Sequence, residues 1–309
     1  MKKQGCLLLL LALLLTGCGE IHQTVEQPAY TIGVVLKAMN SQYWMEIRSG
    51  MEQAASDRGV DLLLLAPQDE KAEQEQAEHI RNLLNNGVDA LLVAPCNSYN
   101  TAWFVELAQE KDIPVLTADT RALDSELPYI GADNESIGRM AANYFAEKLP
   151  DGARIAVLSG SSRQSTHTAR VAAFLDEIHA LGRFAVPEVY YTDGEFSQGY
   201  ERAQGLTDAD ALFCTSAILG LGAVTAQAQQ TETSCSIVAV DMQDDAMEAV
   251  RDGAMDALIT QPGHEIGYQA IETALALLEG EEVSAETLLT GQLLTRENVA
   301  DAAAPGQEE

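Results

Sequence analysis

The sequence predicts an α/β protein with two similar lobes, each built on a doubly wound parallel sheet. Short apolar runs alternate with amphipathic stretches of helix length from Tyr30 onward, and the same alternation starts afresh near Arg154. Alternating strands and helices with short connections favour a parallel sheet covered by helices on both faces. A single parallel sheet of ten strands would be unusually wide, so we expect two sheets of about five strands each.

The first half of this pattern contains four strand candidates and three helix candidates. The strands are expected at residues 31–36, 61–66, 90–94 and 113–118. The helices are expected at residues 43–58, 72–86 and 99–110. Gly59 and Gly87 directly follow the first two helices, as C-terminal caps do, and Pro114 stands at the start of the fourth strand.

The second half repeats the alternation with five strand candidates. These strands are expected at residues 154–158, 186–191, 211–214, 237–240 and 257–260. Helices are expected near residues 165–180, 198–208, 220–230 and 244–253. Roughly 280 residues from Tyr30 onward suffice for one large domain or two ordinary ones.

The first residues have the three parts of an export signal. Met1-Lys2-Lys3 is basic, residues 6–15 are apolar, and Leu15-Thr16-Gly17-Cys18 resembles the lipobox of bacterial lipoproteins. We therefore predict a signal peptide at residues 1–17 and lipidation of Cys18; an ordinary secretory signal with a chance cysteine is the alternative. Residues 18–29 are polar and suit a tether. The protein is expected outside the cytoplasm, anchored to the bacterial cell membrane.

Composition narrows the class of ligand. The formal net charge is −29, and loss of a leader that holds two lysines makes the mature chain more acidic still. Such a surface repels nucleic acid, anionic lipid headgroups and anionic ligands at long range, so a neutral or cationic ligand is favoured. Beyond Cys18 the chain has Cys96, Cys214 and Cys235, spaced too widely for a zinc site. Buried free thiols are expected, and one disulfide stays open.

Catalytic and cofactor motifs do not occur in the sequence. Ser159-Gly160-Ser161-Ser162 differs from the Gly-x-Ser-x-Gly turn of hydrolases, and neither a phosphate-binding loop nor a Gly-x-Gly-x-x-Gly fingerprint is present. The five histidines have no metal-like spacing, although His167 falls near the predicted cleft. We therefore expect no enzyme, no cofactor and no metal.

Several segments together resemble the type I periplasmic binding proteins, which include the ribose and galactose receptors of bacterial ABC transporters. The segments are Gly87 to Pro95 (GVDALLVAP), Tyr129 to Asn134 (YIGADN), Val238 to Asp241 (VAVD) and Ile259 to Gln261 (ITQ). Their order and spacing match over residues 30–298. The resemblance implies that the chain crosses between the lobes three times.

The resemblance also implies the domain boundaries. The hinges are expected near residues 131–133, 261–263 and 282–286. The N-terminal lobe would then comprise residues 30–131 plus 262–284, and the C-terminal lobe residues 132–261 plus 285–300. Residues 301–309 would form a tail.

The ligand site implied by the resemblance lies between the lobes, at the carboxyl ends of strands, where open α/β sheets bind ligands. Its expected residues are Ser41, Tyr43, Trp44, Asp119, Arg170, Ser216, Asp241 and Gln261. Further candidates are Lys37, Asn40, Asn97 and Phe196. Aromatic side chains can stack on the C–H face of a sugar, while carboxylate, amide and guanidinium groups grip its hydroxyls.

Each residue type also fits a structural role. Tyr43 and Trp44 could pack against the next helix, Phe196 could belong to the core, and Gln261 could act only at the hinge. Asp residues that follow strands often cap the next segment. Lys37 and Arg170 could lie on solvated faces.

The second lobe departs from the family pattern in a way that bears on the ligand. Thr215-Ser216-Ala217 stands where many sugar receptors have Gln-Asn-Asp, so an amide and a carboxylate are missing. Ala94 stands where an Asn can precede the proline, with Asn97 as a candidate replacement. One wall of the pocket is therefore expected to be less polar, which leaves ribose and glucose open to question and admits a deoxy sugar, a modified sugar or another small polyol.

We therefore expect a monomeric, lipid-anchored receptor that binds a monosaccharide or related polyol and delivers it to an ABC permease. A lipoprotein that signals to a membrane histidine kinase is the alternative, and an extracytoplasmic hydrolase is a third hypothesis. A sugar-responsive repressor shares this fold, but no helix-turn-helix precedes the lobes and the acidity of the chain opposes DNA binding.

Overall fold

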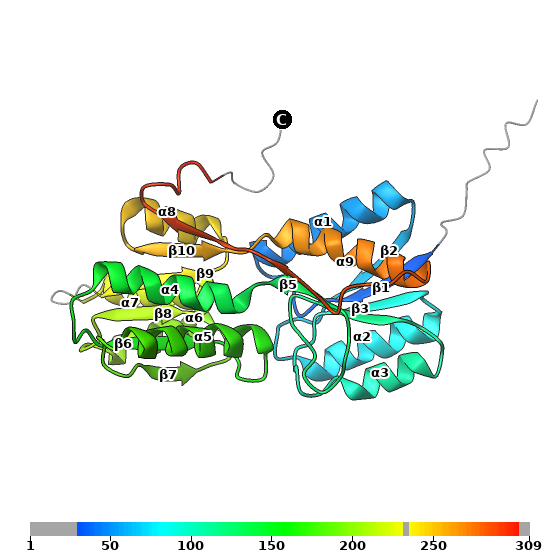
Figure 1. Cartoon of the computed structure of the whole chain (residues 1–309), viewed down its shortest axis with the longest axis horizontal. Helices are drawn as coiled ribbons and strands as arrows, with labels where there is room; N and C mark the ends of the chain where they lie inside the picture. Colours follow the sequence, from blue (N-terminus) through cyan, green and yellow to red (C-terminus); the bar gives the residue numbers. More distant parts are fainter. Residues whose placement is uncertain (1–29, 231–234, 303–309) are drawn as a thin grey trace, which may run out of the picture.

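The computed structural model describes residues 30–230 and 235–302. The predicted signal peptide, the lipidation site Cys18 and the tether at 18–29 lie outside the described residues, as does the tail from residue 303 onward. In the described part, two lobes lie end to end, each with helices on both faces of one sheet (Figure 1). The predicted two-lobed α/β fold is confirmed.

The first lobe is built on six parallel strands in the order β11-β5-β4-β3-β1-β2. They are β1 (Thr31–Val35), β2 (Asp61–Leu65), β3 (Ala90–Val93), β4 (Val115–Ala118), β5 (Tyr129–Ala132) and β11 (Glu286–Leu289). Its helices are α1 (Gln42–Arg58), α2 (Glu73–Asn86), α3 (Ala102–Gln109) and α9 (Gly263–Leu278). Helices α1 and α9 pack together on one face, and α2 and α3 cover the other (Figure 1).

The second lobe also has a six-stranded sheet, in the order β12-β10-β9-β8-β6-β7. Its strands are β6 (Ile155–Ser159), β7 (Glu188–Tyr191), β8 (Ala211–Cys214), β9 (Ser236–Val240), β10 (Ala257–Thr260) and β12 (Gln292–Thr295). Only β12 runs antiparallel to its neighbour among the strands described. Its helices are α4 (Asn134–Lys148), α5 (Ser165–Leu181), α6 (Phe196–Gly205), α7 (Ala217–Gln227) and α8 (Asp244–Asp252).

The third crossing between the lobes differs from the prediction, which puts the hinge at residues 282–286 and assigns residues 285–300 to the second lobe. Instead, β11 pairs in parallel with β5 in the first sheet, and β12 pairs with β10 in the second. The chain therefore crosses between Leu289 and Gln292. Gly291 suits this crossing, because a Cβ there would overlap the carbonyl oxygen of Thr260.

Two glycines allow helices α1 and α9 of the first lobe to pack closely against each other. A Cβ on Gly50 of α1 would overlap the His264 carbonyl of α9, and a Cβ on Gly267 of α9 would overlap the Ile47 carbonyl of α1. Two helices approach this closely only where small residues meet. This contact fixes the start of α1, with its two aromatic residues, against the start of α9.

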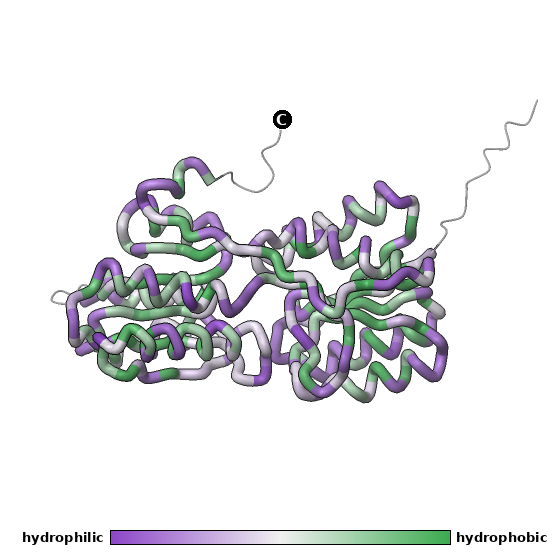
Figure 2. Tube along the Cα trace, viewed as in Figure 1, coloured by the Kyte–Doolittle hydropathy of each residue, from purple (hydrophilic) through white to green (hydrophobic). Residues whose placement is uncertain are grey.

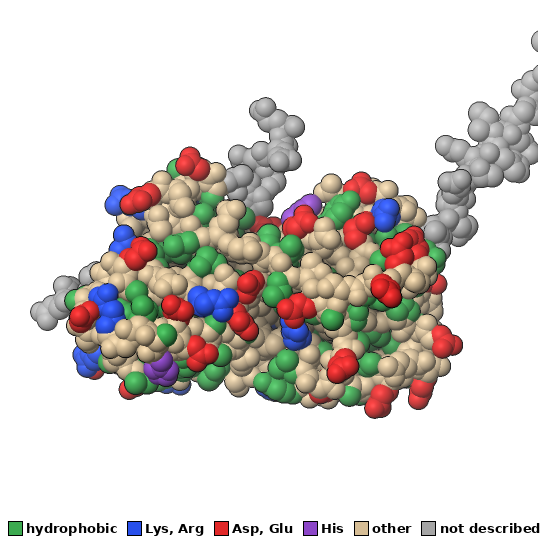
Figure 3. Space-filling view, viewed as in Figure 1, with side chains coloured by type: hydrophobic (Ala, Val, Ile, Leu, Met, Phe, Trp, Pro, Cys, Tyr) green, Lys and Arg blue, Asp and Glu red, His purple; other side chains and the backbone are tan. Residues whose placement is uncertain are grey.

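Hydropathy follows the layers. The strands are hydrophobic and the outer helix faces hydrophilic (Figure 2), as expected of parallel sheets covered on both faces. Acidic side chains are spread over both lobes on the face shown in Figure 3.

None of the helices in residues 30–230 and 235–302 is long and apolar enough to cross a membrane. Cys96, Cys214 and Cys235 are free thiols; Cys96 and Cys214 are buried as predicted, whereas Cys235 is half-buried.

Candidate ligand-binding site

A cavity of about 240 Å³ lies between the two lobes. The residues that line it follow the carboxyl ends of strands in both sheets: Lys37 and Ser41 follow β1, Asp119 follows β4, and Asp241 follows β9. This is the edge at which open α/β sheets bind ligands. The cavity is of a size to hold a small molecule rather than a polymer.

The lobes are joined directly around this cavity. The backbone N–H of Ser98 donates to the Arg163 carbonyl at 2.8 Å, and the backbone N–H of Ser165 donates to Ser98 Oγ at 3.0 Å. An ion pair between Lys71 and Glu195 joins the lobes at the rim of the cavity. The structure therefore shows the lobes in contact across the cleft.

Asp119 organises the wall of the first lobe. Tyr43 donates its hydroxyl to Asp119 Oδ1 at 2.7 Å, Thr120 donates to Oδ2 at 2.6 Å, and Lys37 Nζ lies 3.2 Å from Oδ2. Its φ of 60° lies in the left-handed region, which is strained for a residue other than glycine. Its carboxylate partners are side chains, so the capping interpretation does not describe it.

Lys37 is buried between Asp119 and Glu70, whose Oε2 lies 3.6 Å from Nζ. Burial lowers the pKa of Lys37, but these two carboxylates outweigh it and the pKa is raised. Burial likewise raises the pKa of Glu70, and Lys37 and Trp44 outweigh it, so that pKa is lowered. Both groups are therefore charged at neutral pH, and Lys37 is not the solvated lysine of the alternative interpretation.

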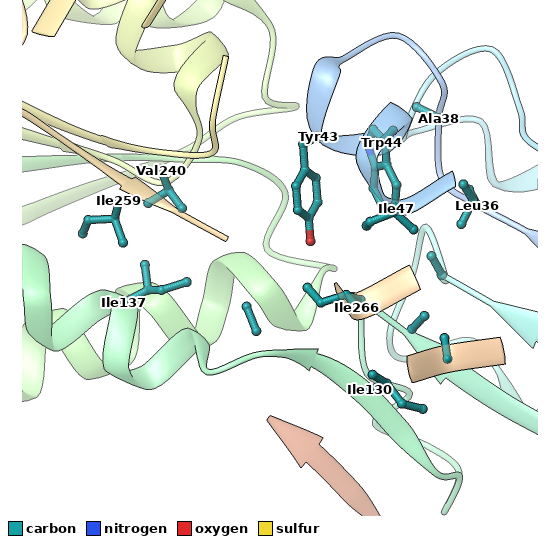
Figure 4. Packing of buried hydrophobic residues seen from close by; sticks show 14 of the residues in the cluster. Leu36, Ala38, Tyr43, Trp44, Ile47, Ile130, Ile137, Val240, Ile259 and Ile266 are labelled. Carbon is teal, nitrogen blue, oxygen red and sulfur yellow. The ribbon is translucent and has the colours of Figure 1, made fainter. Parts of the chain in front are cut away.

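The two aromatic residues line the cavity and belong to the core. Tyr43 and Trp44 are 6% and 2% exposed, with ring centroids 5.4 Å apart and planes at 58°. Trp44 Nε1 donates to Glu70 Oε1 at 3.0 Å. In Figure 4, Tyr43 lies between Trp44 on its own helix and the second-lobe residues Val240 and Ile259. Both roles expected for this pair, cavity lining and core packing, are therefore met by the same residues.

Arg170 is fixed in the wall of the second lobe. It is 2% exposed, its Nε donates to Asn134 Oδ1 at 2.8 Å, and its Nη1 donates to the Thr215 carbonyl at 2.7 Å. Nη1 also lies 4.0 Å from Asp241 Oδ1. The alternative of a solvated helix face is wrong for this residue, because α5 turns it inward against the ends of β8 and β9.

Asp241 occupies the place in the second lobe that Asp119 occupies in the first. It follows a central parallel strand and has a φ of 85°, again in the left-handed region. Gln261 Nε2 donates to its Oδ1. Burial raises the pKa of Asp241, while Arg170 and Gln261 oppose that shift, and the net direction is upward.

His167 lines the cavity but is absent from the predicted ligand residues. Its Nδ1 lies 2.8 Å from Thr215 Oγ1, and its ring packs on Gly160, where a Cβ would overlap it. Burial, Arg170 and Lys37 hold the pKa of His167 well below its usual range, so the ring is neutral at physiological pH. The sequence contains a signal for this position, because His167 lies near the start of α5, three residues before the predicted site residue Arg170.

The structure brings the predicted site residues together with one exception. All line the cavity except Asn97, which donates to Glu73 Oε2 and accepts from the Tyr99 N–H. The hypothesis that Asn97 replaces the amide missing at Ala94 is therefore wrong. His167, expected near the cleft, lines the cavity, and the prediction missed the further lining residues Asp69, Glu70, Lys71, Thr166, Asp193, Gly194, Glu195, Ile218 and Gln243.

Several of the missed residues stand on two loops. Residues 69–71 follow β2 and residues 193–195 follow β7, so each loop leaves the carboxyl end of a strand next to a predicted site strand. That topological position could have indicated them. Within the residues that the structure describes, no group of three His, Cys, Asp or Glu side chains could hold a metal ion.

Comparisons with known proteins agree with this architecture. The periplasmic binding protein domain matches residues 32–282. The chain is 29% identical to the ribose import binding protein of Escherichia coli K12, over 83% of this chain and 87% of that protein. It is 28% identical to the ribose import binding protein of Bacillus subtilis 168, over 92% and 95% of the two chains. An Agrobacterium vitis ABC transporter solute binding protein, solved with bound α-D-tagatopyranose, has a TM-score of 0.83 at 23% identity and covers 88% of this chain and 97% of its own.

Proposed function

The chain belongs to the periplasmic binding protein family, and on this premise we propose that it captures a monosaccharide or related small polyol between its lobes for an ABC permease. The observation that carries the proposal is a cavity lined by fixed polar side chains from both lobes, some of them with unused hydrogen-bonding capacity. Gln261 Oε1 and Ser216 Oγ are buried and have no hydrogen-bond partner among the described residues. Buried polar atoms of this kind are normally satisfied, and a bound ligand would satisfy them.

The charges around the cavity favour a ligand without net negative charge. Lys37 is paired with Asp119 and Glu70, and Arg170 lies near Asp241. A buried cation that is already paired offers little to an anionic ligand, and the acidic surface would slow its approach. Sugar hydroxyls, in contrast, can donate to carboxylate and amide oxygens and accept from the guanidinium.

Binding would be coupled to closure of the two lobes. The side chains available to contact the ligand are Tyr43 and Lys37 on one lobe and Arg170, Asp241 and Gln261 on the other. A ligand that touches both sets binds better when the lobes are together, and this difference in affinity shifts the population toward the closed form. A permease that recognises the closed form would thereby distinguish loaded from empty receptor.

The relatives support a sugar as the ligand. Two of them are named ribose import binding proteins, and a structural neighbour holds α-D-tagatopyranose. These names also support transport over the alternative of signalling to a histidine kinase. The genes beside this one, a permease and ATPase or a kinase, would separate the two.

A panel of D-ribose, D-allose, D-galactose, D-glucose, D-tagatose and xylitol tests the proposal. A ligand that binds only the native state raises the melting temperature, and titration calorimetry then gives its affinity. We expect at least one member to bind and to be recovered chemically unchanged. Absence of binding by the whole panel contradicts the sugar receptor, and conversion of a glycoside to products would support the hydrolase.

The lipid anchor and the monomeric state complete the proposal. The lipobox-like Leu15-Thr16-Gly17-Cys18 is the sequence feature that supports lipidation of Cys18. Labelled palmitate should enter the wild-type protein and not the Cys18→Ala variant, which should leave the membrane fraction. Equal labelling of the two would contradict the anchor. Light scattering of the purified protein should give the mass of one chain.

A further inference from the structure

Helices α5 and α8 of the second lobe begin at the cleft without a cap from their own N-cap side chains. The N-cap residue of α5 is Gln164 and that of α8 is Gln243, and neither side chain makes a capping hydrogen bond. Helix α6, in contrast, has a complete capping box of its own at Glu195 and Gln198. The first N–H groups of a helix have no acceptor within the helix, so α5 and α8 depend on acceptors from elsewhere.

The cap of α5 comes from Ser98 in the first lobe. The backbone N–H of Ser165, the first residue of α5, donates to Ser98 Oγ at 3.0 Å. Ser98 is completely buried, and its own backbone N–H donates to the Arg163 carbonyl at 2.8 Å. In return, Ser165 Oγ accepts from the backbone N–H of Arg121 at 2.9 Å and donates to the Arg121 carbonyl at 3.2 Å. The start of α5 is therefore bonded to the loops of the first lobe that follow β3 and β4.

The cap of α8 comes from Gln42, also in the first lobe. The backbone N–H of Asp244, the first residue of α8, donates to Gln42 Oε1 at 3.0 Å. The nitrogen of the same side chain, Nε2, donates to Asp244 Oδ1 at 3.4 Å. Neither Gln42 nor Ser98 is among the residues that line the cavity. The two caps therefore join the lobes at positions away from a bound ligand.

Both caps exist only while the lobes are together. The N–H donors belong to the second lobe and the side-chain acceptors to the first, so opening of the cleft leaves the donors to water. Loss of a helix cap typically changes an equilibrium constant about fivefold, which corresponds to about 1 kcal/mol. None of these bonds includes a ligand atom, so they favour closure of the empty protein as well as of the loaded one.

We propose that Ser98 and Gln42 are positioning residues that cap α5 and α8 across the cleft and set the balance between the open and closed forms. They change the affinity through that balance, by the same factor for every ligand, whereas the cavity residues determine which ligand binds. Helix α5 carries His167 and Arg170 in the cavity wall, so its cap also holds that wall in the closed position. The effect on affinity rests on the proposed function.

Amide hydrogen exchange in the empty full-length protein, measured by NMR, tests the caps without any sugar. N–H groups at the first position of a helix normally exchange fast, because the helix gives them no acceptor. We expect slowed exchange at Ser165 and Asp244 in the wild type. Ser98→Ala and Gln42→Met should each speed exchange at both amides, because both caps break when the lobes separate. Gln109→Met, at an exposed position on α3, is the matched control and should change neither amide.

The same variants measure the effect of the caps on binding. Calorimetry with each panel sugar that binds should give an affinity about threefold to fivefold weaker in Ser98→Ala and in Gln42→Met. The lower factor applies when part of the empty protein is already closed. The ratio of affinities between sugars should stay as in the wild type, and the loss should come from faster dissociation.

The outcomes separate this inference from the function on which it rests. If no sugar of the panel binds, the proposed function fails, and exchange at the two amides still decides whether the caps exist. Fast exchange at both amides in the wild type overturns the inference, and so does a variant that affects only the amide it contacts, because the cap would then be independent of closure. A loss of affinity that differs between sugars also overturns it. Exchange that speeds up at both amides in both variants supports it.

Discussion

Lys37 of the first lobe donates a hydrogen bond of 3.2 Å to Gln164 Oε1 of the second, and both side chains are buried. Gln164 Nε2 in turn lies 3.5 Å from the Glu70 carbonyl oxygen of the first lobe. These bonds can form only when the lobes meet. They therefore contribute to the free energy of closure, beside the cavity that a ligand would occupy.

Replacing Gln164 by alanine should weaken ligand binding about tenfold, mainly through faster dissociation. The variant loses a hydrogen bond to a buried, charged Lys37, which is worth on the order of 1.5 kcal/mol. Stopped-flow tryptophan fluorescence with the sugar identified by the panel would measure both rate constants. Trp44 lies at the cavity and provides the signal.

The exposed ion pair between Lys71 and Glu195 is the matched comparison, because it also joins the lobes. Exposed pairs contribute little and are screened by salt. Lys71→Ala should therefore change the affinity less than Gln164→Ala, and the difference should widen at high salt. Equal effects of the two substitutions would show that burial does not distinguish these contacts.

Asp241→Asn should abolish most of the binding without loss of stability. The carboxylate is an ionised acceptor facing the cavity, whereas burial makes its charge unfavourable in the empty protein, as its raised pKa indicates. Asparagine also tolerates the left-handed φ of 85°. We expect affinity to fall by a hundredfold or so in calorimetry, since charged hydrogen bonds contribute about 1.5–3 kcal/mol each, while the melting temperature stays the same or rises.

Asp119→Asn is expected to behave in the opposite way in the melting experiment. Asp119 lies 3.2 Å from the buried Lys37 ammonium, and its loss leaves that cation with Glu70 alone. Breaking one side of a buried pair is strongly destabilising, by about 3 kcal/mol. A melting temperature that falls in Asp241→Asn and not in Asp119→Asn would reverse the roles assigned to the two carboxylates.

Glu46 should make binding depend on pH near neutrality. It lies on α1 one turn after Gln42, is 9% exposed, and its Oε1 has no hydrogen-bond partner in the described part of the chain. Burial, followed by Asp241 and Asp244 of the second lobe, raises its pKa from 4.5 to about 7. On α9, which packs against α1, His264 and Glu265 are exposed.

The sign follows from where the proton is held. The folded protein binds a proton at Glu46 up to about pH 7, because the pKa is raised to that value, whereas an unfolded chain releases it near 4.5. The contribution of Glu46 to stability is therefore fully present at low pH and is lost as the pH rises from 4.5 to 7. If opening separates Glu46 from the two aspartates, it relieves the part of the pKa shift that they cause, and ligand affinity should be higher at pH 6 than at pH 8.

Glu46→Gln should remove this dependence and bind at pH 8 as wild type binds at pH 6. Calorimetry from pH 5.5 to 8.5 would measure it, and melting without ligand would test the stability part separately. Glu52→Gln, an exposed change on the same helix, should keep the wild-type profile. Asp244→Asn should move the midpoint of the binding profile to lower pH. An unchanged midpoint would mean that Asp244 of the second lobe does not raise the pKa of Glu46.

Sequence patterns predicted the lobes because most central parallel strands, such as β3, β6 and β8, are buried apolar runs that stand out from their neighbours. They did not predict β11 and β12, which are edge strands of four residues with alternating exposure and little apolar contrast. For the same reason, the third crossing of the chain between the lobes was predicted at the wrong residues. Pairing partners far apart in sequence, such as Glu286 with Tyr129, determine it.

The site was predictable where a residue directly follows a strand, as Asp119 and Asp241 do. What the pattern could not give is the state of each side chain. Lys37 is buried rather than solvated because Glu70, on a loop after another strand, supplies a second carboxylate. Asn97 stands next to the expected position, yet its side chain turns away to Glu73.

The position of Arg170 depends on a glycine contact between α4 and α5. A Cβ on Gly138 of α4 would overlap the backbone carbonyl of Arg170, so the helices could not keep their present approach. Gly138→Ala should therefore lower stability by about 1–3 kcal/mol, as overpacking does, and should also weaken ligand binding, because α5 carries Arg170 away from Asp241. Urea unfolding and calorimetry would measure the two effects.

Gly205→Ala at the end of α6 is the control, because a Cβ at this position would have no neighbour within 4 Å and the φ of Gly205 is not positive. Alanine there should leave binding unchanged and stabilise the protein by about 0.4–1 kcal/mol, since it restricts the unfolded chain. Both substitutions reduce backbone freedom equally, so the difference between them isolates the helix contact. A Gly138→Ala protein that melts lower but binds normally would show that Arg170 is positioned by Asn134 and Thr215 alone.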